Sequence, residues 1–327
     1  MPSFVNDDNG NAPRYYLPIL LSANDGSGFQ QQVVINSSTY SAYEASNLSN
    51  INFQDGAGHL IPSWLESGET SSSTSTVYWV TLPNGSITTI YMVFVGTSKR
   101  SISGNNTGAE PNYTGTYGQY DNGATVFSPL YDNFAGTSLS GLWETFGHSV
   151  IATVDNGVTS TSSSYGALVS VRSTFNPDDY AFDMYGYSIT PSNRLGMGGW
   201  LNPSTTYPFQ VSTLPEFSLT DWALYYPTYD MGVAADNNPH VFTVWSSTTN
   251  TIGFGLVDYA HKTSGSLRSG FAGTSTAQEE VIYTEGGTGF TQWSRIRYLP
   301  TGGNMPTITL GSVTPITPPY ASNIMWL

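Results

Sequence analysis

The strongest constraint on the fold of this chain is a two-residue alternation of apolar and polar side chains, repeated in short segments that are separated by turn residues. The stretch VYWVTLPNGSITTIYMVFVG, residues 77–96, is an example. An alternation of period two places successive side chains on opposite faces of a strand, and Pro83-Asn84-Gly85 in the middle is a turn signal. We therefore predict a β-hairpin here. Its alternating positions are Val77, Trp79 and Thr81, followed by Ile90, Met92 and Phe94.

The same pattern recurs along the chain, and nowhere does an apolar period of 3.6 residues run for three turns. Segments up to residue 96 have the spacing of an antiparallel sandwich, and about ten later segments are typical of a jelly roll. Residues 97–127 have no period and are rich in Gly, Asn, Ser, Thr and Tyr, which indicates a linker or surface loop. The predicted fold is all-β with almost no helix, in two tandem antiparallel β-sandwich or jelly-roll domains. Residues 1–120 form the first, with a linker from about 97, and residues 121–327 form a jelly roll with a C-terminal tail.

Composition excludes several classes of function. Only 10% of the residues are charged, and the formal net charge is −14 with nine Lys and Arg, so binding to nucleic acid is not expected. No apolar run approaches the roughly 18 residues of a membrane span. Cysteine is absent, which rules out disulfides and thiol-ligated metals. A low density of carboxylates also predicts that the protein tolerates an acidic exterior.

Two parts of the chain resemble known families. Within residues 14–96 the elements YYLPILL, INFQDGAGHLIPSWLES and TTIYMVFVG follow one another as in an uncharacterised β-sandwich module of archaeal and bacterial surface proteins. In that family a concanavalin A-like (LamG-like) jelly roll commonly follows, and YDNFAGTSLSGLW, residues 131–143, resembles its opening. The closing WSRIRYLPTGGNMPTITLG, residues 293–311, resembles its last strand. The resemblance implies an exterior location and carbohydrate binding as a frequent role, and it carries over no catalytic residues.

No reactive centre is expected from the spacing of chemical groups. A glycoside hydrolase needs two carboxylates on one strand face, whereas Glu280 and Glu285 have an odd spacing that places them on opposite faces. Glu279 beside them fits a solvated strand end, and Asp178-Asp179 fits a turn. No G-x-S-x-G elbow occurs, and the four histidines are isolated. We therefore expect a protein without enzymatic activity.

The expected role is structural attachment. The start at Met1 shows no export signal, which favours a virion surface (spike or turret-type) component, located outside the cell, over a secreted or cell-surface protein whose leader was removed. The alternatives are such an adhesin, filament or surface-layer component, and a polysaccharide-active glycoside hydrolase or lyase. Self-assembly or contact with other exterior proteins is expected, with the apolar end Ile324–Leu327 as a docking point or as part of its own domain.

Glycan binding is predicted for an aromatic segment, because sugars stack on aromatic rings while carboxylates accept hydrogen bonds from their hydroxyls. Burial in the core is the alternative for its tryptophan. A second tyrosine-rich segment, with Tyr113, Tyr117 and Tyr120, is an alternative interface. The predicted glycan-binding residues are Trp222, Tyr225, Tyr226, Tyr229 and Asp230.

Two kinds of modification or ligand are also considered. Calcium is the candidate cofactor, with Asp7, Asp8 and Asp132 as weak ligand candidates, although ordinary Asx-turn chemistry is favoured for these residues. Five Asn-x-Ser/Thr sequons are candidates for glycosylation, and in a Ser/Thr-rich chain such triplets also arise by chance. They are Asn36, Asn47, Asn84, Asn105 and Asn112.

Overall fold

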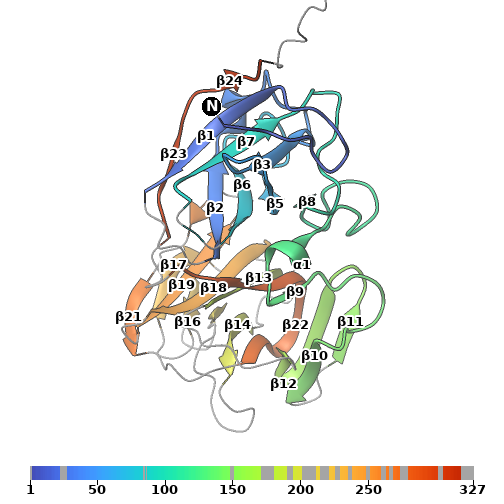
Figure 1. The fold of residues 1–327 in the computed structure, drawn as a ribbon. Coiled ribbons are helices and arrows are strands. Elements are labelled where there is room, and N and C mark those ends of the chain that lie inside the picture. Colours follow the sequence, from blue (N-terminus) through green and yellow to red (C-terminus); the bar gives the residue numbers. More distant parts are fainter. Residues whose placement is uncertain are drawn as a thin grey trace, which may run out of the picture. The chain divides into compact units, whose positions relative to one another are not determined.

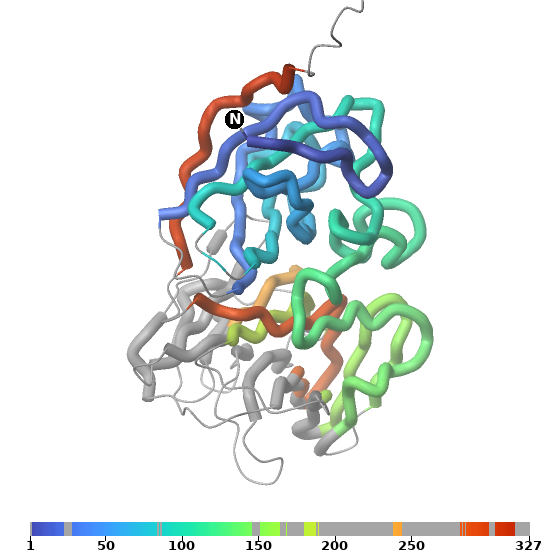
Figure 2. The backbone as a smooth tube through the Cα atoms, viewed as in Figure 1, coloured from blue at the N-terminus to red at the C-terminus, as the bar shows by residue number. Residues whose placement is uncertain are grey.

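A computed structural model of the chain divides into two compact units (Figures 1 and 2). The first unit contains residues 1–126 and 305–327, and the second contains residues 127–304. The structure describes residues 2–22, 28–83, 85, 87–147, 151–170, 180–189, 194–200, 211–213, 221–224, 229–234, 238–247, 251–258, 263–264, 268–272, 279–300 and 305–317.

The first sheet of the first unit is built around two apolar strands, β1 and β7. Buried positions alternate along β1, where Leu17, Ile19 and Leu21 face the core. The C-terminal part of the chain, red in Figure 2, runs antiparallel to β1. The order is β23-β1-β7-β3-β4, and β24 also pairs with β1. The strands are β1 (Tyr15–Leu21), β3 (Ile51–Gln54), β4 (Leu60–Ile61), β7 (Thr89–Phe94), β23 (Ile308–Leu310) and β24 (Thr314–Pro315).

The second sheet of this unit faces the first across an aromatic core. The rings of Phe53 in the first sheet and Tyr78 in the second meet edge to face with centroids 5.3 Å apart. Its order is β2-β6-β5-β8, and all its pairs are antiparallel except β5 with β8, which is parallel. The strands are β2 (Phe29–Ile35), β5 (Ser63–Ser67), β6 (Thr76–Leu82) and β8 (Thr107–Ala109).

The predicted hairpin at residues 77–96 is wrong in its pairing, although both strands exist. β6 pairs with β2 and β5, whereas β7 pairs with β1 and β3 in the facing sheet. Residues 83–88 therefore carry the chain from one sheet to the other. Nearly every residue of β6 is buried, which suits a strand covered on both faces better than one half of an exposed hairpin. A second Asn-Gly signal, at Asn156-Gly157, does form a hairpin, with Val154 opposite Val158.

The second unit contains an eleven-stranded sheet along the path β10-β12-β22-β13-β18-β19-β20, with β9, β11, β14 and β21 paired to its members. Three further strands form the small sheet β15-β16-β17. The bounds are β9 (Leu130–Asp132), β10 (Trp143–Gly147), β11 (Ile151–Val154), β12 (Val158–Ser170), β13 (Tyr180–Ser188), β14 (Arg194–Trp200), β15 (Val211–Thr213), β16 (Asp221–Leu224), β17 (Tyr229–Ala234), β18 (His240–Ser247), β19 (Thr251–Asp258), β20 (Thr263–Ser264), β21 (Arg268–Ala272) and β22 (Glu279–Tyr298).

Strand β22 connects several strands of this unit, because different strands pair with it along its 20 residues. Its first half lies between β12 and β14, and its last residues lie between β13 and β9. The register with β12 shifts next to Gly286, whose φ of +66° lies in the left-handed region that glycine adopts without strain. The segments EEVIYTE and FTQWSRIRYLP, expected as separate strands, are therefore one bent strand.

The all-β prediction is confirmed, and the described elements include only a 3₁₀ turn, η1 (Ser37–Thr39), and a four-residue helix, α1 (Gly123–Val126). The first unit ends at residue 126 and resumes at residue 305, and the predicted domain boundary near residue 120 stays a prediction. Residues 308–310, within the segment PTITLG that was expected in the second domain, pair with β1 in the first unit. No helix among the described residues has the length and apolarity needed to cross a membrane.

Candidate functional site

Three loops of the first unit each carry one glutamate with unusual surroundings. Glu44 lies between β2 and β3, Glu69 lies between β5 and β6, and Glu110 directly follows β8. We call these three residues, together with Tyr78 and Tyr113, the carboxyl cluster. Its members come from separate parts of the sequence, so the fold assembles it.

The parallel pair β5/β8 brings two of these loops together. Leu65 is opposite Ala109, so the two strands end at the same edge of the sheet. The backbone N–H of Glu110 donates to the carbonyl of Leu65 at 2.8 Å. Gly68, which directly precedes Glu69, has a φ of +74° and so allows the chain to turn at this point. The two glutamates are thereby held beside each other.

The three loops are also joined to one another, which fixes the frame of the cluster. Backbone groups link the β2–β3 loop with the β5–β6 loop, and the hydroxyl of a cluster tyrosine reaches the β2–β3 loop. These bonds run from Ser38 N to Ser73 O at 3.0 Å, from Ser71 N to Ser46 O at 3.0 Å, and from the Tyr113 hydroxyl to Asn47 O at 2.7 Å.

Glu69 and Glu110 form a carboxyl pair that shares a proton. Burial, the negative charge of Glu110 and a hydrogen bond with Glu110 raise the pKa of Glu69 to about 8. Two carboxyl groups in contact cannot both be ionised, so one holds the proton and donates it to the other. At neutral pH the pair therefore contains one acid and one base.

Glu44 and Tyr78 form the second part of the cluster. Glu44 is only 4% exposed, and burial raises its pKa to about 8. The nearby hydroxyl of Ser37 partly offsets this increase, but it is already paired with Thr76 Oγ1 at 2.9 Å. Neither carboxyl oxygen of Glu44 meets the geometry of a hydrogen bond in the described structure, and the same holds for the hydroxyl of Tyr78, which is 3% exposed.

The cluster has the properties of an acid–base site. A carboxylic acid whose pKa lies near neutrality can donate a proton, and an ionised neighbour can accept one. Groups with such perturbed pKa values gather at functional sites more often than elsewhere. Sequence analysis missed this site because Glu69 and Glu110 are far apart in the chain and the parallel β5/β8 pairing has no sequence signal of its own.

The predicted glycan-binding residues are only partly within the described residues. Trp222 lies on β16, and Tyr229 and Asp230 begin β17, where the register pairs Leu224 with Tyr229. Tyr225 and Tyr226 lie outside the described residues. The glycan site stays a prediction. In the alternative tyrosine-rich segment, Tyr113 is part of the carboxyl cluster.

The predicted sequons differ in accessibility. The residues Asn36, Asn105 and Asn112 are exposed, whereas Asn47 is half-buried and its side chain accepts a hydrogen bond from Ser49 N at 3.3 Å. Asn84 lies outside the described residues. Three of the five positions therefore offer the access that an attached glycan requires.

The three calcium candidates all serve as hydrogen-bond acceptors. Asp7 is 6% exposed and accepts from the backbone N–H groups of Asn9 and Asn11 and from the Ser101 hydroxyl, at 2.7–3.0 Å. Asp8 accepts from the Ser103 hydroxyl and from Asn106. Asp132 accepts from Phe134 N at 2.7 Å, from Trp143 Nε1 at 3.0 Å and from Ser140. A cation would have to displace these donors, and calcium stays an untested prediction.

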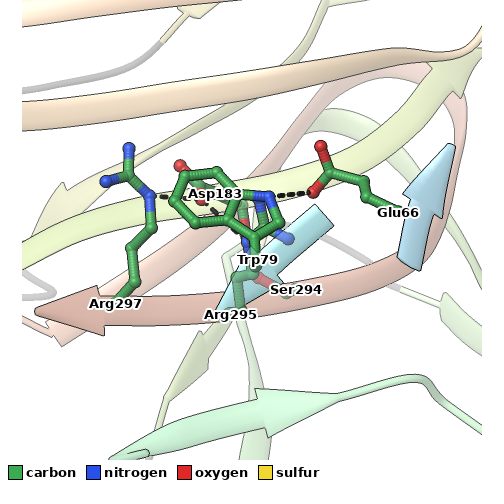
Figure 3. A network of polar contacts seen from close by, with 6 residues as sticks. All are labelled: Glu66, Trp79, Asp183, Ser294, Arg295 and Arg297. Carbon is green, nitrogen blue, oxygen red and sulfur yellow. Dashed lines mark hydrogen bonds and ion pairs between the residues drawn. The ribbon is translucent and has the colours of Figure 1, made fainter. Parts of the chain in front are cut away.

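Buried polar groups also occur outside the cluster (Figure 3). In the first unit, the indole N–H of Trp79 donates to Glu66 at 2.9 Å. In the second unit, the Nε atoms of Arg295 and Arg297 each lie 2.8 Å from Oδ2 of Asp183. Burial alone would raise the pKa of Asp183, but the charges of Arg297 and Arg295 outweigh it and lower that pKa. These groups are salt-bridged or hydrogen-bonded, as structural buried charges are.

Comparisons with known proteins give similarity only at the level of solved structures. No family model and no curated protein matches the chain. The solved structures include a β-1,3-1,4-glucanase (lichenase) derived from a mouse hindgut metagenome, with 11% identity, and a Bacillus licheniformis β-glucanase, with 13% identity. Each covers 52% of this chain at a TM-score of 0.37, and 98% and 96% of its own chain, respectively. A third, described with endo-acting O-glycanases of the human gut microbiota, has 8% identity and a TM-score of 0.39, and covers 52% of this chain and 99% of its own.

These findings correct our expectation of a non-enzymatic virion surface protein. The matching proteins named above are glucanases and a protein described with glycanases, and none of them is a virion or attachment protein. Their low TM-scores do not assign an activity to this chain. The expectation considered only carboxylates spaced along one strand, whereas in the structure two loops of the first unit also bring Glu69 and Glu110 together.

Proposed function

We propose that this chain is a polysaccharide-cleaving enzyme of the glycoside hydrolase type, with Glu69 and Glu110 as its acid and base. The observation that supports the proposal is the carboxyl pair, in which Glu69 keeps a proton at neutral pH next to Glu110. Hydrolysis of a glycosidic bond requires one carboxylic acid and one carboxylate about 5–9.5 Å apart, so the hydrogen-bonded pair has to separate when the substrate enters. The pair supplies both from a frame fixed by the β5/β8 edge.

The chemistry follows from where the shared proton goes. When a glycosidic oxygen enters between the two carboxyls, it takes the place of Glu110 as the acceptor of the Glu69 proton. The bond between the anomeric carbon and this oxygen breaks as the oxygen is protonated. Glu110 accepts a proton from the attacking water, whose oxygen forms the new bond to the anomeric carbon. Transfer of that proton back to Glu69 restores the starting state.

The surface of the segment after β8 supports a glycan as substrate. Its exposed side chains are neutral groups that form hydrogen bonds, as the hydroxyls of a sugar require. The net charge of −14 disfavours a phosphate-rich substrate. The proposed site of action is outside the cell, where polysaccharides form walls and coats. The exposed residues are Asn112, Thr114, Thr116 and Gln119.

The proposal predicts that Glu69→Gln and Glu110→Gln each abolish most of the activity. Because each removes one partner of the acid–base pair, the rate should fall by on the order of 100-fold or more. The measurement is the release of reducing ends from a panel of neutral and acidic polysaccharides by the full chain.

Glu144→Gln is the matched control, because Glu144 is exposed on β10 of the second unit; it should retain full activity. Circular dichroism of each variant checks that the fold is intact. Full activity in folded Glu69→Gln and Glu110→Gln proteins would place the reaction elsewhere, and no released sugar from any polysaccharide would contradict the enzyme itself.

A further inference from the structure

The remaining unusual feature is the buried end of the carboxyl cluster, at Glu44 and Tyr78. We propose that the junction of the three loops is a pH-sensitive lock. Protons on Glu44 and Glu69 keep the loops joined in acid, and the loops separate when these protons are lost. The lock is a property of folding and does not depend on the proposed hydrolase activity. It would set the pH range in which the first unit keeps its shape.

The geometry at Glu44 favours a proton, because no cation among the described residues acts on this carboxyl group. It is almost completely buried, and neither of its oxygens is within hydrogen-bond geometry of a donor in the described structure. Burying an ionised carboxylate without a partner costs several kcal/mol, so the neutral form is favoured. The loop around it is rigid, since the side chain of Asn50 bonds the backbone of Ala45, Tyr43 and Val95 at 2.7–2.9 Å.

Among the described residues, the groups that face Glu44 add no positive charge. Tyr40 on its own loop and Tyr78 on β6 both interact with it electrostatically, and Tyr78 also interacts with Glu69 and Tyr113. Glu110 faces Glu69. Arg100 acts on Tyr113, and its guanidinium lies over the Tyr120 ring, 4.6 Å from the centroid. Deprotonation would therefore add negative charge to a place that already holds one shared negative charge.

A metal ion is the less favoured occupant of this place. A hard cation such as calcium takes six to eight oxygen ligands, commonly including several carboxylates. Within the residues that the structure describes, no three His, Cys, Asp or Glu side chains are grouped so that they could hold a metal ion. Glu44 contributes a single carboxyl group, whereas one proton neutralises it completely.

The direction of the pH effect follows from linkage. The pKa of both Glu44 and Glu69 is about 8 in the folded chain and about 4.5 as the ordinary value. Between these limits the folded state holds protons that the unfolded state has lost, so stability decreases as pH rises. The contribution is fully present below about pH 4.5 and is lost as pH increases through about 8.

The bonds that should break first are those between the loops. Ionisation of Glu44 favours movement of the β2–β3 loop towards water, and the hydrogen bonds from Ser38 N to Ser73 O and from Ser71 N to Ser46 O connect this loop to the β5–β6 loop. The amide of Thr81, which bonds Pro62 O at 2.9 Å within the second sheet, lies outside the junction. The protection of the first two amides should fall at high pH, and that of Thr81 should not.

The experiment is thermal unfolding of the full chain from pH 4 to 9, compared with Glu44→Gln and the exposed control Glu144→Gln. The wild-type midpoint should rise as pH falls from 9 to 5, and Glu44→Gln, which cannot ionise, should unfold about 5 °C or more above wild type at pH 9 and close to it at pH 4.5. The control should follow wild type throughout. Equal pH dependence in wild type and Glu44→Gln would overturn the lock.

Two further measurements keep the result unambiguous. If Glu44→Gln does not fold, hydrogen exchange of wild type replaces it, and protection factors of Ser38 and Ser71 that stay constant from pH 5 to 9 contradict the proposal. The second measurement adds 5 mM CaCl₂ or EDTA at pH 8. A midpoint that rises with calcium in wild type but not in Glu44→Gln would show that a cation, and not a proton, occupies the site.

Discussion

A single residue with a buried charge can strongly affect the stability of its surroundings, and Asp183 is the clearest example in the second unit. It is completely buried, and two arginine Nε atoms lie 2.8 Å from the same carboxylate oxygen. The guanidinium of Arg295 is also packed between the rings of Phe127 and Trp293, with centroids 4.4 and 4.5 Å away. The charge of Asp183 therefore stabilises two arginines in this core.

Asp183→Asn should destabilise the protein strongly, because it removes the charged carboxylate that the Nε atoms of both buried guanidinium groups contact. The expected loss is about 3–5 kcal/mol of unfolding free energy, measured by urea denaturation near neutral pH. Asp155→Asn, at an exposed hairpin position, is the control and should change stability by less than about 0.5 kcal/mol. A loss no greater than in this control would mean that the buried ion pairs contribute little.

The same residue sets the acid limit of stability. The pKa of Asp183 is lowered by its arginines against the effect of burial, so its contribution is present above the ordinary aspartate pKa and is lost as pH falls below it. The two units thus respond to acid in opposite ways: the carboxyl cluster gains stability from neutral pH down to about 4.5, whereas the Asp183 group weakens only below that range. The tolerance of acid expected from composition stays a prediction, and it depends on which of these two effects is larger.

Among the elements, the turn after β5 decides where Glu69 lies. Gly68 has a φ of +74°, and a Cβ placed on it would lie 2.7 Å from Thr76 Cα and close to the Ser75 carbonyl. Gly68→Ala should therefore destabilise the first unit, both by strain in the backbone and by this clash. Because Glu69 follows directly, the variant should also lower the proposed polysaccharide cleavage at pH values where it remains folded.

Gly10→Ala separates backbone strain from the clash when the unfolding free energies of both variants are measured by urea denaturation. Gly10 has a nearly equal φ of +76° but nothing within 4 Å of the added Cβ. It should cost only the conformational penalty of about 1–2 kcal/mol, and Gly68→Ala should cost more. Equal losses in the two variants would indicate that the turn yields without a clash, and the position of Glu69 would then not depend on Gly68.

The elements also show how far sequence patterns lead. The alternation at residues 77–96 correctly indicates two strands, yet it contains no information on which strands they pair with, and β6 and β7 belong to facing sheets. At Asn156-Gly157 a shorter connection between Val154 and Val158 allows only the hairpin. Local pattern therefore predicts strands well, whereas pairing is predictable only where the turn is too short for any alternative.

The candidate site could not be predicted for the same reason. Glu69 and Glu110 meet because β5 and β8 run parallel, and a parallel pair is a long-range feature that no local spacing reveals. The aspartates gave a better result: the Asx-turn bonds favoured for Asp7 and Asp132 are present, from Asn9 N and Phe134 N respectively. Hydrogen bonds between a side chain and residues near it in the sequence are predictable, whereas contacts between side chains far apart in the sequence are not.

At the scale of the whole molecule, the first unit is closed by the end of the chain. β23 and β24 both pair with β1, and the amides of Gly311 and Ile316 donate to the carbonyls of Pro18 and Arg14 at 2.8 and 2.9 Å. Without these strands β1 would become an exposed edge of the first sheet, with unpaired backbone groups. The first unit therefore depends on residues that are translated after the second.

Ending the chain at residue 304 should consequently destabilise the first unit while leaving the second intact. Hydrogen exchange measured by mass spectrometry is the suitable readout, since β1 and β7 peptides should lose protection and β12 and β13 peptides should keep it. A chain ending at residue 317, which retains both strands, is the control and should match the full chain. If β1 keeps its protection in the shorter chain, the sheet is stable without its last strands, and the C-terminal segment is an addition to the first unit and not part of its core.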